Sequence, residues 1–478
     1  MCRFFIFILL VFSIPPASSQ TDVWSLQRCV QYAVEHNISV QQDVLNKRLA
    51  HYTLLQSQLA QLPTVSGTGS YGRSFGRSAN PTTNQFVDAD YNLASLSANS
   101  NLLLFGWFQQ RNLISKNKLS LEASQADLDQ LKDDISLNVA TGFLRALQAQ
   151  EQIHVSEKQV DLSKAQLAQT KSFADAGRLP ELNVAQLESQ LATDSSNLIN
   201  AIATFNSTIL DLKALLNLDF DVPFSILPPD VQVAEQMAVS AMQPEEIYQK
   251  AKGHFGSIKS GELKLESAQK GLNSAKGALL PQLSLSYQAS TNWVSSSQTP
   301  VYSKDSIPYN TGLYIQPTAN GNPYVYQTIA PITGLKNTPV GDQLSNYFRQ
   351  ILLINLNVPL FNGWQAQYAV RQSKINVETQ ELNLYQAELT LKQNVYKAHN
   401  DAINSIQKYY ASLRAEEAAK RALDFAQKRY DLGLTSTVDF LVTQNQHYTA
   451  EYNLLSNKYD LIFKLKVIDY YLGKELKL

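Results

Sequence analysis

The residues that most often bind metals or act as nucleophiles are scattered along this chain. No two histidines stand four residues apart, and no cysteine accompanies them at a metal-binding spacing; they are His36, His51, His154, His254, His399 and His447. Metal binding is therefore unsupported. We find no glycine-rich phosphate loop and no nucleophile motif. The sequence predicts no metal site, no cofactor and no enzymatic activity.

The first residues have the pattern of a secretory signal peptide, which we place at residues 1–20. Arg3 supplies a positive charge, and an apolar core follows at residues 4–14. With cleavage near Gln20, the mature chain keeps only Cys29 and cannot form an internal disulfide. No later apolar run approaches the ~20 residues of a spanning helix. If this exported chain crosses a membrane, it must do so as a β-barrel.

Two long stretches of the chain resemble each other. Each reads as a helix, a strand pair and a long helical hairpin, in the same order. The period is far too long for a solenoid unit. We therefore expect two structural repeats, at residues 21–218 and 244–478, joined by a linker at 219–243.

Each repeat contains one predicted strand pair, at about residues 64–105 in the first repeat and 281–361 in the second. Apolar and small polar residues alternate within them. In the second repeat, Leu283 and Leu285 point to one face and Ser284 to the other. Such alternation suits a barrel strand between lipid and a wet lumen, although a half-buried soluble strand alternates identically. The export signal, and the lack of further strands for a sandwich, favour the membrane interpretation.

Both strand pairs end in a junction of an aromatic residue, glycine and tryptophan that leads directly into a helix. Glycine can take the backbone angles that a switch from sheet to helix demands. The aromatic side chains suit the interfacial girdle of a membrane barrel, with ordinary core packing as the alternative. The junction residues are Phe105, Gly106, Trp107, Phe361, Gly363 and Trp364.

The helical hairpins are predicted at about residues 107–217 and 364–473. The long first helix of each hairpin would span roughly 105 Å. The returning helix is only about half as long, as at residues 181–216 in the first hairpin. The helix that precedes each strand pair, at residues 25–60 in the first repeat, could supply the other half of the return leg. Seven-residue spacing predicts coiled-coil packing of the first long helix, at Val139, Ala146, Ile153, Val160, Leu167 and Ala174. By contrast, residues 295–344 read as a long irregular loop.

Taken together, these residues resemble the TolC-type outer-membrane channel family over essentially the whole mature chain. The most specific matches are the segments Pro359-Leu360-Phe361-Asn362-Gly363-Trp364, Leu432-Gly433-Leu434-Thr435 and Asp439-Phe440-Leu441. The resemblance implies an α+β membrane protein in the cell outer membrane with a long periplasmic extension. It would be a homotrimer whose protomers each give four strands to a 12-stranded β-barrel, continuous with a coiled-coil α-helical barrel.

In that family the hairpin turns form the periplasmic gate and dock an adaptor protein. The resemblance therefore implies docking at both turns. The turn of the second repeat matches the family well, at Leu432, Gly433, Leu434 and Thr435. The turn of the first repeat keeps the glycine but differs around it, at Gly177, Arg178 and Leu179. A helix C-cap is the alternative for both glycines.

Asp439 falls where the family places an acidic ring at the gate, and Asn183 takes its place in the first repeat. Three copies of Asp439 around an axis would attract cations. The alternative is a carboxylate in a helix's first turn, where the helix dipole favours it.

The resemblance implies a passive exit duct for drugs, small molecules or proteins in a tripartite efflux or type I secretion system. Its partners would be a periplasmic adaptor (membrane fusion) protein and an inner-membrane RND pump or ABC exporter. A periplasmic coiled-coil adaptor and a structural spacer without a lumen are the two alternatives. With a net charge of −1, the chain gives no reason to expect nucleic acid as a partner.

Overall fold

A computed structural model describes residues 23–79, 86–88, 90–228, 242–314 and 324–474. The predicted signal peptide lies outside the described residues. The chain divides into two compact units. One, here called the helical unit, comprises residues 1–52, 118–267 and 378–478, and the other, the sheet unit, comprises 53–117 and 268–377. Among the residues described, no helix is both long and apolar enough to cross a membrane.

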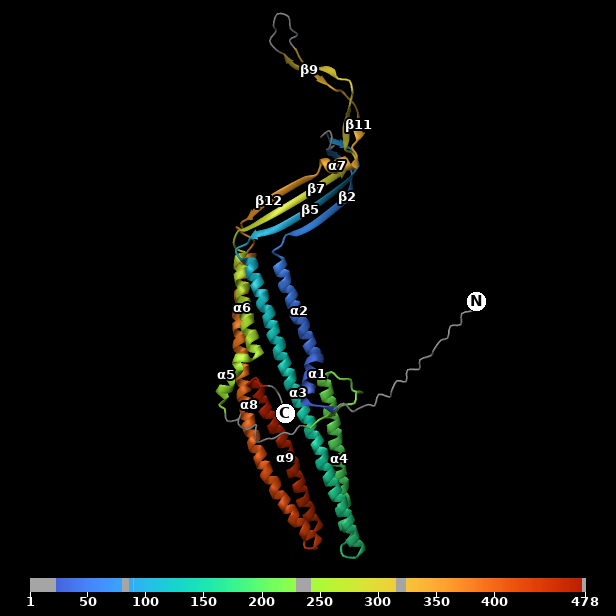
Figure 1. The fold of residues 1–478 in the computed structure, drawn as a ribbon, viewed down its shortest axis with the longest axis vertical. Coiled ribbons are helices and arrows are strands. Elements are labelled where there is room, and N and C mark those ends of the chain that lie inside the picture. The colour runs from blue at the N-terminus through green and yellow to red at the C-terminus, as the bar shows by residue number, and fades with distance from the viewer. Residues whose placement is uncertain (1–22, 80–85, 89, 229–241, 315–323, 475–478) are drawn as a thin grey trace, which may run out of the picture. The chain divides into compact units, whose positions relative to one another are not determined.

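Helices of nearly equal length occur in the same order in both halves of the chain (Figure 1). The first half has helices of 11, 22, 67 and 36 residues: α1 (Leu26–His36), α2 (Ile38–Leu59), α3 (Gln109–Asp175) and α4 (Glu181–Leu216). The second half has four corresponding helices of 11, 22, 67 and 35 residues: α5 (Pro244–His254), α6 (Gly256–Gly277), α8 (Gln365–Asp431) and α9 (Thr437–Tyr471). The two sets of lengths therefore agree to within one residue.

The prediction of one continuous helix at residues 25–60 is wrong, because the chain leaves the helical conformation at Asn37 (φ −62°, ψ 130°). The Asn37 side chain accepts a hydrogen bond from the Ser39 N–H at 2.9 Å and donates to the Leu215 carbonyl at 3.2 Å. Asparagine side chains compete with helical hydrogen bonds in this way. The break joins the start of α2 to the end of α4, which is the end-to-end stacking predicted for the return leg.

The corresponding break in the second half falls at Phe255 (φ −67°, ψ 123°). The Phe255 ring packs against Tyr470 and Tyr471 at the end of α9, with ring centroids 5.4 and 5.8 Å apart. Asparagine and phenylalanine therefore hold the same kind of helix end by different interactions, a side-chain hydrogen bond in one half and aromatic packing in the other.

Two apolar clusters form the core of the helical unit. The first surrounds Phe143 and Leu212, and it includes Trp24 from the two-residue parallel pair β1 (Val23–Trp24) and β6 (Ser225–Ile226). Cys29 is buried in this cluster, and burial raises the pKa of its thiol to about 12. The second cluster joins α5 and α6 to α8 and α9. On α8, a seam formed by Val395, Ala398 and Ala402 is buried.

The sheet unit contains one four-stranded antiparallel sheet in the order β12-β7-β5-β2. Its strands are β2 (Thr64–Ser74), β5 (Tyr91–Phe105), β7 (Gln282–Val294) and β12 (Arg349–Asn357). The last strand ends at Asn357, four residues earlier than predicted. Pro359 explains this, because proline has no N–H to donate to the ladder and restricts the residue before it.

The register gives the sheet one apolar and one largely polar face, as the alternation predicts. Leu285 lies between Ile354 and Leu102 on the apolar face. The polar face is crossed by hydroxyl and amide hydrogen bonds, which include Thr68 to Ser97 at 2.6 Å, Ser70 to Ser95 at 2.7 Å and Asn355 to Ser286 at 2.9 Å. Exceptions on the polar face are apolar side chains of β12, β5 and β7, at Ile351, Leu353, Leu93, Leu103 and Val294.

The interpretation of residues 295–344 as an irregular loop is wrong. This segment forms two paired ribbons and a short helix: β8 (Gln298–Tyr302) with β11 (Ile332–Asn337), β9 (Ile307–Tyr314) with β10 (Tyr324–Ile329), and α7 (Val340–Asn346). Tyrosine, isoleucine and valine favour strands, but the intervening proline, glycine and asparagine hid that signal. A further short pair joins β3 (Arg77–Ala79) to β4 (Phe86–Asp88).

Phe143→Ala should destabilise the helical unit strongly, because the Phe143 side chain is completely buried in the first cluster. Removing such a ring typically costs about 3–5 kcal/mol of unfolding free energy. Phe425→Ala is the matched control, since that ring is 67% exposed, and surface changes usually stay within about 0.5 kcal/mol. Urea unfolding followed by far-UV circular dichroism measures both, and equal losses would contradict this core assignment.

Candidate functional site

The two hairpin turns are closed by the same hydrogen-bond pattern. In each, a glycine N–H donates to the carbonyl three residues back, and the next N–H donates to the carbonyl five residues back. The distances are 2.8 and 2.8 Å at Gly177 and 2.9 and 2.8 Å at Gly433. Both glycines are left-handed, with φ of +73° and +70°. The C-cap interpretation of both glycines is therefore confirmed.

Outside this shared cap the turns present different surfaces. Leu432 and Leu434 are 73% and 62% exposed on either side of Gly433, and Thr435 is half-buried. At the first turn Leu179 is half-buried, and the Arg178 guanidinium lies over the Phe173 ring at 4.7 Å. The second turn therefore offers apolar side chains, whereas the first offers a cation.

Asp439 lies in the first turn of α9 and is exposed. The Ser436 hydroxyl accepts a hydrogen bond from the Asp439 N–H at 3.1 Å and donates one to its carboxylate at 2.7 Å. This is the capping arrangement considered as the alternative for Asp439, and it fixes where the carboxylate points. Asn183 is half-buried in the first turn of α4, whose N-cap residue is Pro180 and makes no side-chain capping bond.

A buried aromatic pair behind the second turn was not foreseen. The Tyr430 and Phe440 rings stack at 4.7 Å, and the Tyr430 hydroxyl bonds to Thr170 of α3 at 2.9 Å and to Thr437 at 3.4 Å. This cluster ties the two hairpins together near their turns. Thr170 continues the seven-residue series of small residues on α3 that includes Ser163, and that spacing could have revealed it.

Further from the turns, hydroxyls, amides and one carboxylate form a polar seam between α3, α4 and α9. Buried Asp194 accepts hydrogen bonds from Ser163 at 2.5 Å, Gln190 at 2.9 Å and Gln159 at 3.3 Å. Gln444 of α9 donates to Ser163 at 3.4 Å. Further bonds cross the same seam, from Ser156 to Tyr448, from Gln148 to Ser456 and between Gln190 and Asn445. The seam contrasts with the apolar clusters at the other ends of these helices.

A charged cluster fixes α5 against α8. The Glu245 carboxylate accepts hydrogen bonds from the Gln249 amide and the Tyr396 hydroxyl, both at 2.8 Å, and lies 3.1 Å from the Lys392 ammonium. These hydrogen bonds, led by that of Gln249, lower the pKa of Glu245 to about 2. The carboxylate is therefore charged throughout the physiological pH range.

At the junctions between strand and helix, the expected role of glycine holds in only one case. Gly363 and Trp364 have φ of +64° and +69°, but in the first junction the left-handed residues are Trp107 (+48°) and Phe108 (+60°). Gly106 is not left-handed. A Cβ at Gly106 would lie 3.2 Å from a Leu103 methyl carbon, so this glycine permits a close approach instead.

The aromatic side chains at both junctions are exposed, as an interfacial girdle would require. They are Phe105, Trp107, Phe361 and Trp364. Their position at a membrane interface stays a prediction. In the residues that the structure describes, no group of three His, Cys, Asp or Glu side chains is placed to hold a metal ion.

Comparison with protein families identifies this arrangement of sheet and paired hairpins. The family model described as outer membrane efflux protein matches residues 29–218 and 341–473. The chain belongs to the outer membrane efflux protein family. The matched ranges of this outer membrane efflux protein contain both hairpins and both turns, together with Asp439 and Asn183.

Individual relatives of this efflux protein are distant in sequence, and the alignments cover most of each chain. Outer membrane efflux protein BepC of Brucella suis biovar 1 (strain 1330) is 22% identical over 401 residues, which cover 83% of this chain and 74% of BepC. Outer membrane protein TolC of Salmonella enteritidis is 21% identical over 468 residues, which cover 98% of this chain and 85% of TolC. The crystal structure of the Campylobacter jejuni CmeC outer membrane channel matches the fold with a TM-score of 0.70 at 16% identity, over 94% of this chain and 85% of CmeC.

Gly433→Ala should loosen the end of α8 in this efflux protein. An alanine at a left-handed position costs roughly 1–2 kcal/mol, so the cap hydrogen bonds should open more often. Gly253→Ala in α5 is the matched control, because nothing lies within 4 Å of the added Cβ and alanine favours a helix. Hydrogen exchange at the Leu434 amide should accelerate several-fold in the first variant only; unchanged exchange there would contradict this role.

Proposed function

We propose that this chain is the outer-membrane exit duct of a tripartite efflux or type I secretion system. The observation that carries the proposal is the four-stranded sheet of a family member, with one apolar face, one polar face and two open edges. Such a sheet suits lipid on one side and water on the other. Energy would come from a pump, and this chain would conduct passively without catalysing a reaction.

Assembly of three copies would give each edge strand of the sheet a partner strand. One chain leaves the outer backbone groups of β12 and β2 without a partner strand in the described sheet, and hydrocarbon offers no partner for them. Three copies joined edge to edge give a closed 12-stranded barrel. Eight strands would be filled by side chains, so 12 leave room for a lumen lined by the polar face. The long helices would continue this barrel as a coiled-coil tube into the periplasm.

The hairpin turns are the proposed docking site of a periplasmic adaptor, which would link the duct to an inner-membrane RND pump or ABC exporter. Leu432 and Leu434 give the second turn an exposed apolar contact on a rigid cap. The first turn, with Arg178 and Leu179 beside Gly177, would make a second and chemically different contact. Two unlike turns per chain let three chains present six sites of two kinds.

Asp439 is the proposed gate carboxylate, and Asn183 is its uncharged counterpart in the first hairpin. The Ser436 hydroxyl holds the Asp439 carboxylate in place while leaving it exposed. In a trimer three such carboxylates would form one acidic ring. The residue one turn later is Val442 and not a second acid, so the cation preference rests on a single ring.

Asp439→Asn should therefore weaken cation preference. The purified protein in a planar lipid bilayer is expected to conduct, and a potassium chloride gradient gives its ion preference from the reversal potential. Asp439→Asn should shift that potential toward zero while leaving the conductance near that of the wild type. Asp424→Asn removes another exposed carboxylate, from α8, and should shift nothing. An unchanged reversal potential in Asp439→Asn would exclude the gate role.

The two alternative functions predict different outcomes. A soluble adaptor would leave the membrane fraction in a high-salt wash, whereas a barrel requires detergent. A spacer without a lumen would give no single-channel conductance. Either result would replace the exit-duct proposal.

A further inference from the structure

A cavity of about 470 Å³ lies within the helical unit. It is lined by residues of three helices, α3, α4 and α9. On α3 the lining residues stand three or four positions apart, which places them on one face of that helix: Arg145, Gln148, Ala149 and Gln152. A space of this volume can hold a small organic molecule.

Small residues on α3 and α4 make room for the cavity. The two helices approach closely at Gly142, where an added Cβ would lie 3.1 Å from a Leu215 methyl carbon and 3.4 Å from one of Leu212. About two turns further along α3, Ala149 lines the cavity together with Ala201 of α4. These alanines are only 6% and 7% exposed. They therefore form an apolar floor for the cavity.

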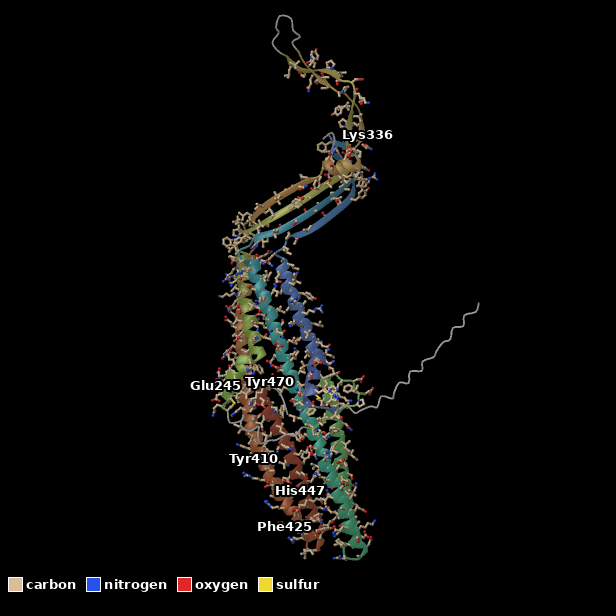
Figure 2. The ribbon with its side chains drawn as sticks, in the orientation of Figure 1. Glu245, Lys336, Tyr410, Phe425, His447 and Tyr470 are labelled. Carbon is tan, nitrogen blue, oxygen red and sulfur yellow. The ribbon has the colours of Figure 1, made fainter. Side chains whose placement is uncertain are left out.

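Two tyrosines of α9 form a wall of the same cavity. Tyr448 and Tyr452 lie about one helical turn apart, and His447, the residue before Tyr448, marks their level on α9 in Figure 2. The Tyr448 hydroxyl bonds to the Ser156 hydroxyl at 3.1 Å and accepts from the Gln152 amide at 3.5 Å, which holds the ring in place. Tyr452 is 42% exposed. Such rings can stack on a flat apolar ligand.

Arg145 gives the other end of the cavity a positive charge. Its side chain is exposed, and no aspartate or glutamate occurs among the described residues that line the cavity. The positions three, four and seven residues away on α3, which share its face, hold no acid either. Within the described ranges of the chain, Arg145 has no ion-pair partner. It precedes Ser156, the partner of Tyr448, by eleven residues, which is about 16 Å along α3.

Most other donors around the cavity are already engaged within the protein. The hydroxyls of Thr204 and Thr208 each donate to a carbonyl of α4 at 2.8 Å, and the Gln148 amide donates to the Ser456 hydroxyl at 3.2 Å. All described lining residues apart from Arg145 are uncharged. A guanidinium pairs best with a carboxylate or a similar oxyanion, to which it can donate two hydrogen bonds.

We propose that this cavity binds a small organic anion with an aromatic body. The carboxylate or sulfonate group of the ligand pairs with Arg145, and the aromatic body lies over Ala149 and Ala201 against the tyrosine wall. Because α3 and α4 form the first hairpin and α9 belongs to the second, the ligand contacts both hairpins of one chain. The inference goes beyond the exit-duct proposal and does not rest on it, since one chain supplies every lining residue.

Calorimetric titration of the full-length protein in lipid nanodiscs tests the site, with empty nanodiscs as the blank. The anion 2-naphthalenesulfonate should bind saturably, and the neutral 2-naphthalenesulfonamide, which has the same ring system, should bind more weakly. Arg145→Gln should weaken binding of the sulfonate about tenfold and leave that of the sulfonamide unchanged. Arg421→Gln is the matched control, because it removes an exposed arginine of α8 outside the cavity.

Two further variants locate the bound anion. Thr204 is an exposed lining residue, so Thr204→Trp should fill the cavity and abolish binding of both probes, with far-UV circular dichroism to check that the variant remains helical. Asn200→Cys places a thiol on the lining, and 2-naphthalenesulfonate should slow its reaction with N-ethylmaleimide several-fold. Asn206→Cys, exposed on α4 outside the lining, should react at an unchanged rate. Native Cys29 is buried and should not interfere.

The possible results separate this site from the exit duct. Saturable binding that Arg145→Gln weakens and Thr204→Trp abolishes would establish the site. A lack of saturable binding, or binding that neither variant changes, would overturn it. Equal binding of the sulfonate and the sulfonamide, unaffected by Arg145→Gln, would overturn the preference for an anion. A protein that binds the anion but does not conduct in bilayers would overturn the exit duct alone, and one that conducts without binding would overturn the site alone.

Discussion

Backbone hydrogen bonding at the sheet edges is the constraint on which the remaining features depend. The described sheet ends at β12 on one side and at β2 on the other. A strand edge within lipid needs a partner strand, and water cannot reach it to substitute. The chain continues from β12 into α8, and α2 leads into β2. In the proposed barrel, the strands that need partners are thus joined directly along the chain to long helices.

The contacts within the helical unit change in character along its helices. They are mainly apolar far from the hairpin turns and more polar towards them. Apolar clusters around Phe143 and Val395 lie where α4 meets α2 and α9 meets α5 and α6. Towards the turns, hydroxyl and amide hydrogen bonds join the two hairpins, including Ser156 to Tyr448 and Gln190 to Asn445, and the stacked Tyr430 and Phe440 rings add a smaller buried contact. A polar contact can exchange its partners for water at a small net cost, whereas an apolar one loses its burial. The larger apolar clusters of the helical unit therefore lie far from the turns.

The regular elements were predictable because their periods are long and clean. Helix α4 spans the predicted return leg at residues 181–216, and the two hairpins, at residues 109–216 and 365–471, lie within their predicted ranges. The break at Asn37 was not predictable from periodicity, because its cause is a hydrogen bond to Leu215, 178 residues away. The ribbons at residues 298–337 were missed because turn residues dilute their strand signal. At the candidate site, sequence placed the turns and Asp439, but the stacking of Tyr430 on Phe440 depends on tertiary packing.

The agreement in helix length between the two halves limits how this chain can change. Helices α3 and α8 both have 67 residues. One added residue would rotate everything beyond it by about 100° and lengthen the helix by about 1.5 Å. An insertion in α3 alone would move its turn away from the turn of α8 and take Thr170 out of reach of Tyr430. Length changes should therefore survive only as matched sets in all four hairpin helices, in whole heptads that restore the face. The lengths of α3 and α8 therefore cannot change independently, although the two helices lie far apart in the sequence.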